Sequence, residues 1–225
     1  MGTSTRNTLP RLKKKIEELN SSSNINTHDL KKLLGSLLYP NNRESYTSNH
    51  IIKSLSSPNF IRTIKKVIRT SENYVSSGTL SFGISEFDSY SFNEQVDLIA
   101  DYFVDYEDPI LKQTIKDILL ENGIDGTFAN GFMMFKKIIS IYVEHKIEGT
   151  IFEMLSEKYE TISDEDIYSK INSVTEIITN SIISQNAYDK LVLNIGNENY
   201  VEGWMTEHIP LILKGISIWL NLFLT

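Results

Sequence analysis

Apolar residues recur every three or four positions through most of the chain after residue 90. In one segment Phe92, Val96, Ile99 and Phe103 fall on one face of a helix. We expect helices over 91–103, 110–122, 127–159 and about 163–183, and a last one from about 200. A chain of 225 residues is long enough to bury a core between such helices. This helical spacing of the apolar residues therefore predicts a mainly α fold, with a C-terminal helical bundle over 91–225.

Capping residues stand where several of these helices should begin or end. Ser91 and Glu94 have the spacing of a capping box, in which two side chains satisfy free backbone N–H groups. Asp108 and Pro109 suit an N-cap and a first-turn proline. Gly123 is a suitable helix end, because glycine adopts a positive φ without strain. These signals predict separate helices rather than one continuous rod.

The first third of the chain differs in charge from the remainder. Residues 1–75 hold 13 Lys and Arg against 5 Asp and Glu, a net charge of +8, whereas residues 76–225 hold 9 against 24, a net charge of −15. We expect residues 1–75 to form a basic N-terminal arm with short helices near 12–19, 27–38, 51–55 and 60–68. Residues 76–90, rich in Ser, Thr, Gly and aromatic residues, are predicted to be a linker, with a short strand pair near 79–87 as the alternative.

Residue patterns for the common catalytic chemistries do not occur in this sequence. It contains no cysteine, phosphate loop, nucleophile elbow or dinucleotide fingerprint. Its four histidines have no metal-ligand spacing, and Glu144 and His145, adjacent on a helix, should diverge by about 100° as solvated side chains. We therefore expect a protein that is not an enzyme and that holds no metal or cofactor.

The ends of the sequence favour a cytoplasmic location. The first twenty residues are basic and lack the apolar core of a secretory signal. The apolar stretch from Ile209 to Leu224 is interrupted by Pro210 and Lys214 and is shorter than the roughly 20 clean residues of a membrane span. We expect a buried terminal helix there rather than a membrane anchor.

The chain starts with Met1, Gly2, Thr3 and Ser4. Removal of the methionine exposes the amine of Gly2, which is partly neutral and nucleophilic because α-amino groups titrate near pH 7.7 to 8.0. Glycine has no Cβ, so its backbone can enter a narrow pocket. Arg6 stands where N-myristoylation requires Ser or Thr, which disfavours a lipid anchor.

Four blocks of sequence, in order, resemble the QatB family of the Qat antiphage defence systems. They are the N-terminal Met1 to Ser4, Leu98 to Phe103, Thr114 to Leu119 with Gly123 and Ile124, and Tyr142 to Glu148. The resemblance implies three protein partners: a QueC-like protein, QatC, a KAP-type ATPase and a TatD-like nuclease. It also implies that the QueC-like partner activates a deazaguanine acid with ATP and that the Gly2 amine attacks it.

Two interpretations follow. In the first, the chain is a non-catalytic defence component whose Gly2, Thr3 and Ser4 enter the active site of the QueC-like partner. In the alternative, it is a structural or nucleic-acid-binding protein that uses its basic arm. We favour a protein partner over nucleic acid, because no stacking platform of aromatic residues accompanies the basic segments. Electrostatic contacts are expected at Arg11, Lys13, Lys14, Lys15, Lys65 and Lys66.

Overall fold

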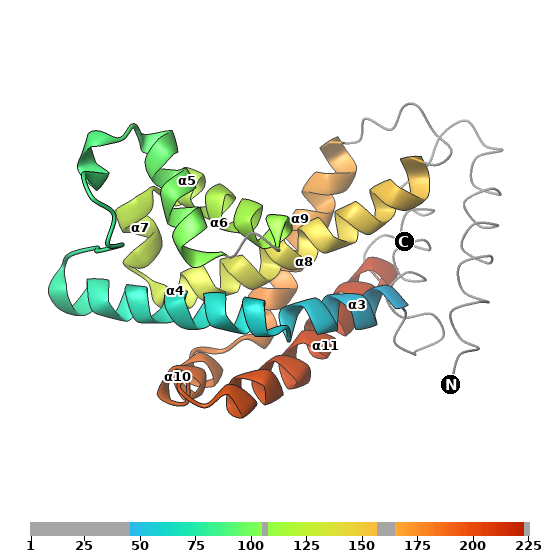
Figure 1. Cartoon of the computed structure of the whole chain (residues 1–225). Coiled ribbons are helices and arrows are strands. Elements are labelled where there is room, and N and C mark those ends of the chain that lie inside the picture. The colour runs from blue at the N-terminus through green and yellow to red at the C-terminus, as the bar shows by residue number, and fades with distance from the viewer. Residues whose placement is uncertain (1–45, 105–107, 157–164, 223–225) are drawn as a thin grey trace.

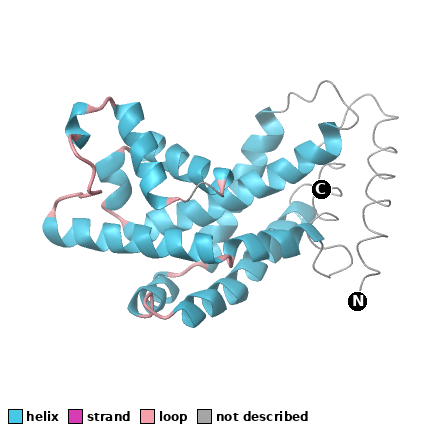
Figure 2. Ribbon diagram, viewed as in Figure 1, coloured by secondary structure: helices cyan, strands magenta, loops and turns pink. Residues whose placement is uncertain are grey.

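The computed structural model describes residues 46–104, 108–156 and 165–222, and this part is an assembly of helices (Figures 1 and 2). The described residues contain no strand, so the mainly α prediction is confirmed. The elements are α3 (Tyr46–Leu55), α4 (Pro58–Ser77), the 3-10 helix η2 (Phe87–Ser89), α5 (Phe92–Phe103), α6 (Pro109–Asn122), α7 (Ile124–Phe128), α8 (Gly131–Ser156), α9 (Glu165–Ile182), α10 (Gln185–Leu193) and α11 (Glu198–Leu222).

Helix α8 lies at the centre of the assembly and contacts α3, α4, α6, α7 and α9. Its apolar side chains are buried on several sides of the helix, as the broad apolar stripe predicts: Phe135, Ile138, Ile139, Tyr142, Val143 and Ile147. The Tyr142 ring packs against Phe60 of α4, with their centroids 5.1 Å apart. A helix with apolar side chains on several sides needs neighbours on each of those sides, which explains its central place.

Helices α3 and α4 belong to the same core as the helices that follow them. Their buried side chains join one hydrophobic cluster with those of α5 to α11: Ile51, Leu55, Phe60, Ile61, Ile64, Val67 and Ile68. Ser57 caps α4 by accepting from the N–H of Phe60 at 3.2 Å, and Gly78 ends it at φ 71°. The described part of the predicted arm, residues 46–75, is therefore integral to the bundle, because α4 buries its apolar face against α8.

The predicted linker also packs against this core. Phe82 is buried among aromatic rings of α5 and α7, and Leu80, Ile84 and Phe87 pack beside it. Residues 79–87 form no strand pair; η2 begins at Phe87 and is followed by α5. Four apolar side chains within eight residues make this segment part of the fold rather than a spacer.

The predicted caps are confirmed. The Ser91 N–H donates to the Glu94 carboxylate at 2.8 Å, and Asp108 accepts from the N–H of Leu111 at 3.0 Å ahead of Pro109. Gly123 ends α6 with φ 71°. These interactions join residues no more than three positions apart, so the sequence alone determines them.

Two boundaries differ from the prediction. The helix expected over 127–159 is divided into α7 and α8 around Ala129 and Asn130, where Asn130 caps α8 by accepting from the N–H of Met133 at 3.0 Å. The short α10 follows α9 as a separate helix, capped by Ser184. Helix α11 continues through Pro210. Within the described residues, no helix combines the length and apolar character that crossing a membrane requires.

Candidate functional site

Most residues of the predicted site lie outside the part of the chain that the structure describes: Gly2, Thr3, Ser4, Arg11, Lys13, Lys14 and Lys15. Lys65 and Lys66 are described, on α4. Two groups of polar residues in the described part remain as candidates. One is a basic surface on α4, and the other is a polar junction between α6, α8 and α9.

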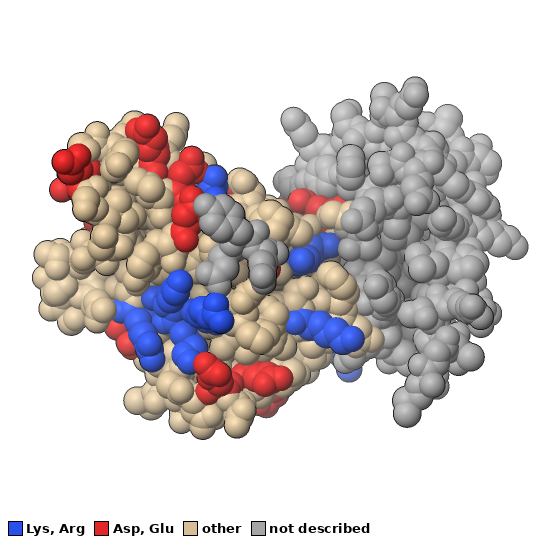
Figure 3. Space-filling model, viewed as in Figure 1, with Lys and Arg blue, Asp and Glu red and all other residues tan. Residues whose placement is uncertain are grey.

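The basic face of α4 consists of Arg62, Lys65, Lys66 and Arg69, and Figure 3 shows Lys and Arg gathered over this helix. Arg62 and Arg69 are exposed, and Lys65 and Lys66 are half-buried. Lys65 Nζ lies 3.2 Å from a carboxylate oxygen of Glu198 on α11. Lys65, at which the sequence predicts electrostatic contacts, therefore joins α4 to α11.

Lys66 joins α4 to α5. Its Nζ donates to the backbone carbonyl of Tyr102 at 3.1 Å and lies 5.6 Å from the centre of the Tyr102 ring. The ring faces the cation with its negative π-surface, an attraction of about 0.5 to 1 kcal/mol at exposed sites. The ammonium of Lys66 is thus held at one position on the surface.

The polar junction has His145 of α8 at its centre. Its Nε2 lies 3.5 Å from a carboxylate oxygen of Asp117, and its Nδ1 lies 3.4 Å from the hydroxyl of Thr114, both on α6. Gln113 donates to the other Asp117 oxygen at 2.7 Å. Burial lowers the pKa of His145, an effect that the negative Asp117 partly offsets. The imidazole is therefore favoured in its neutral form.

Two carboxyl groups of α8 lie on the side of this junction that faces α9. Burial, together with the charges of Glu148, Asp117 and Glu176, raises the pKa of Glu144 to about 7, although a hydrogen bond with Asn172 acts in the opposite direction. Burial likewise raises the pKa of Glu148 to about 7. Glu144 is 8% exposed. Glu144, predicted to be solvated, is buried, and His145, also predicted to be solvated, is half-buried, because α6 and α9 cover two different sides of α8.

Thr114, His145 and Asp117 supply a hydroxyl, an imidazole and a carboxylate, the groups of a nucleophilic triad. The Thr114 hydroxyl is fully buried and donates to the Ile110 carbonyl of its own helix at 2.9 Å. In a catalytic triad, the attacking hydroxyl must be accessible to a substrate and must give its proton to the imidazole. The Thr114 hydroxyl meets neither requirement, so these three groups form a contact between α6 and α8 rather than a nucleophilic site. Sequence spacing missed the contact because Asp117 and His145 are 28 positions apart.

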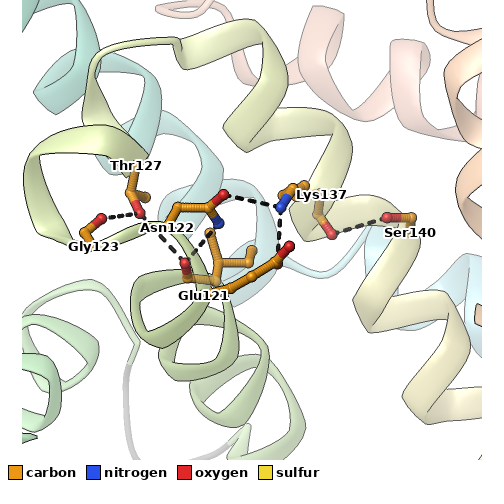
Figure 4. Close-up of polar contacts among 7 residues, drawn as sticks. Glu121, Asn122, Gly123, Thr127, Lys137 and Ser140 are labelled. Atoms are coloured by element: carbon orange, nitrogen blue, oxygen red, sulfur yellow. Dashed lines mark hydrogen bonds and ion pairs between the residues drawn. The ribbon is translucent and has the colours of Figure 1, made fainter.

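A third polar network lies at the corner between α6, α7 and α8 (Figure 4). Lys137 of α8 binds the Glu121 carboxylate at 2.8 Å and the Asn122 side-chain oxygen at 3.1 Å. Thr127 donates to the Gly123 carbonyl at 2.6 Å, which ties α7 to the end of α6. These contacts hold the corner together.

In the described ranges, no three His, Cys, Asp or Glu side chains are grouped so that they could hold a metal ion. In comparisons with known proteins, no family model matches the chain, and neither a curated protein nor a solved structure matches it.

Proposed function

We propose that this chain is a non-catalytic component of an antiphage defence system that acts as a protein partner and as a substrate. In this proposal the helical bundle binds a QueC-like, ATP-dependent enzyme, QatC, and residues Gly2 to Ser4 enter its active site. A KAP-type ATPase and a TatD-like nuclease are the further partners that the resemblance implies. The chain itself supplies the amine that is modified.

The packing of the resembling sequence blocks supports this proposal. Leu98 to Phe103 lies on α5, Thr114 to Leu119 on α6, and Tyr142 to Glu148 on α8, and α6 packs against both other helices. Two ion pairs join α5 to α6, Lys112 with Asp101 and Lys116 with Asp97, and His145 of α8 contacts Asp117 of α6. Blocks that are separate in the sequence thus form one continuous three-helix unit.

The proposed chemistry needs only an amine from this chain. The QueC-like partner activates the carboxyl group of a deazaguanine acid with ATP. The Gly2 nitrogen attacks the activated carbonyl carbon, a C–N amide bond forms, and the activating group leaves. The amine loses its proton to solvent. An α-amino group that titrates near pH 8 is neutral often enough at cytosolic pH to react, unlike a lysine side chain near pH 10.4.

Intact-mass measurement tests the proposal directly. After co-expression with the QueC-like protein, we expect an added mass that peptide mapping confines to the segment starting at Gly2. Gly2→Val should carry no added mass, because a branched side chain obstructs entry into a narrow pocket. Asn7→Ala is the matched control and should be modified like the parent chain.

Defence assays complete the test. Phage protection should disappear with Gly2→Val and persist with Asn7→Ala. Full protection by a chain whose terminus stays unmodified would contradict the role as a substrate.

A further inference from the structure

The outward side of α4 is polar, and most of its charged residues are cations. Residues that recur every three or four positions share one side of a helix. On α4 this side presents Asn59, Arg62, Lys65, Lys66, Arg69, Asn73 and Ser76. The exposed Glu72, three positions after Arg69, is the one carboxylate of α4 on this side, whereas the exposed Val75 lies on another side of the helix. In a chain with a net charge of −7, four cations on one surface are a local reversal of sign.

The four cations span a defined length. At 1.5 Å per residue, the Cα atoms of Arg62 and Arg69 are separated by about 10 Å along the helix axis. The carboxylate of Glu198 and the ring and carbonyl of Tyr102 restrain the two lysines between them. An anion that binds here therefore meets two positioned ammonium groups flanked by two exposed guanidinium groups.

We propose that the basic face of α4 binds the phosphate backbone of nucleic acid without sequence specificity. Protein–protein interfaces have an apolar, aromatic core, which this side of α4 lacks, whereas nucleic-acid interfaces are polar and positively charged. Guanidinium groups match phosphate oxygens in bidentate geometry, and successive phosphates present charge along a line. This surface is independent of the proposed modification of Gly2.

Glu198 is a competitor for the phosphate. Its side chain is 80% exposed and pairs with Lys65, which is only 16% exposed. An incoming phosphate exchanges one exposed ion pair for another, at little cost, because such pairs contribute only about 0 to 1 kcal/mol. Removing this carboxylate should therefore strengthen binding.

Fluorescence anisotropy with the full chain tests the surface, using labelled 20-nucleotide single-stranded DNA, duplex DNA and RNA over a series of salt concentrations. Arg62→Gln/Arg69→Gln should weaken binding at least tenfold at low salt. For duplex DNA, the slope of log K against log salt concentration should become less steep by about 2, since each lost phosphate contact removes about 0.9 from it. Glu198→Gln should bind more tightly than the parent chain. The control is Lys190→Gln/Lys214→Gln, which removes the same charge from exposed positions on α10 and α11 and should bind within twofold of the parent.

Three outcomes overturn the assignment, provided that circular dichroism shows each variant to be folded. The first is no saturable binding to any of the nucleic acids. The second is an equal loss of affinity in Arg62→Gln/Arg69→Gln and in Lys190→Gln/Lys214→Gln, which would mean that net charge alone governs binding. The third is that polyglutamate of matched charge binds as tightly as the nucleic acids and loses the same affinity in Arg62→Gln/Arg69→Gln. This result would assign the surface to an acidic protein.

Discussion

Glu144 and His145 are consecutive residues that lie in different environments. His145 contacts Asp117 and Thr114 of α6, while Glu144 lies among Glu148 of α8 and Asn172 and Glu176 of α9. The angle of about 100° between neighbouring helical positions was predicted from the sequence. What the sequence could not predict is that a different helix covers each direction, because both partner helices come from distant parts of the chain.

The raised pKa values of Glu144 and Glu148 predict a stability that falls as the pH rises. A carboxyl group whose pKa increases from 4.5 to about 7 on folding contributes stability that is fully present below pH 4.5 and lost as the pH passes 7. In Glu144→Gln/Glu148→Gln this loss should be absent. At pH 8 the free energy of unfolding should exceed that of the parent by on the order of 1 to 3 kcal/mol, and at pH 5 the two should nearly agree.

Urea denaturation at pH 5, 6, 7 and 8 measures this difference. Glu202→Gln/Glu207→Gln, at exposed positions of α11, removes the same charge and should follow the pH dependence of the parent chain. If both pairs changed the pH dependence equally, overall charge rather than burial would be its cause.

At the scale of the helix, α11 contains two glycines in opposite surroundings. A Cβ on Gly215 would lie 2.7 Å from Cγ2 of Ile178 in α9, whereas a Cβ on Gly203 would meet nothing within 4 Å. The branched Ile178 side chain has few alternative rotamers, so it cannot move aside easily. Gly215 therefore allows α9 and α11 to approach closely, while Gly203 only weakens its helix.

Substituting each glycine with alanine should change stability in opposite directions. Gly203→Ala should raise the free energy of unfolding by about 0.5 to 1 kcal/mol, because alanine favours the helix. Gly215→Ala should lower it by about 1 to 3 kcal/mol through overpacking against Ile178. Thermal and urea unfolding of both variants provide the measurement. A stabilised Gly215→Ala would mean that α9 and α11 are farther apart than the structure places them.

At the scale of the whole molecule, one core extends from α3 to α11. A chain that begins at residue 76 lacks α3 and α4 and exposes the side of α8 that packs against them, including Tyr142. We expect this fragment to lose cooperative unfolding, since core side chains each contribute about 1.5 to 3 kcal/mol when fully buried. A chain that begins at residue 46 keeps the described core and should unfold cooperatively. Circular dichroism during urea titration distinguishes the two, and a cooperative fragment 76–225 would instead support a separate bundle.

The sequence by itself determined the helical class, most of the helices and their caps. Ser91 with Glu94, Asp108 with Pro109, and Gly123 act over three positions or fewer, so the neighbouring residues contain the whole interaction. Only the tertiary structure decided that residues 46–90 join the core and that Glu144 and His145 are covered. Burial depends on partners from distant parts of the chain, such as Phe60 against Tyr142, and the local period of apolar residues carries no information about which helices meet.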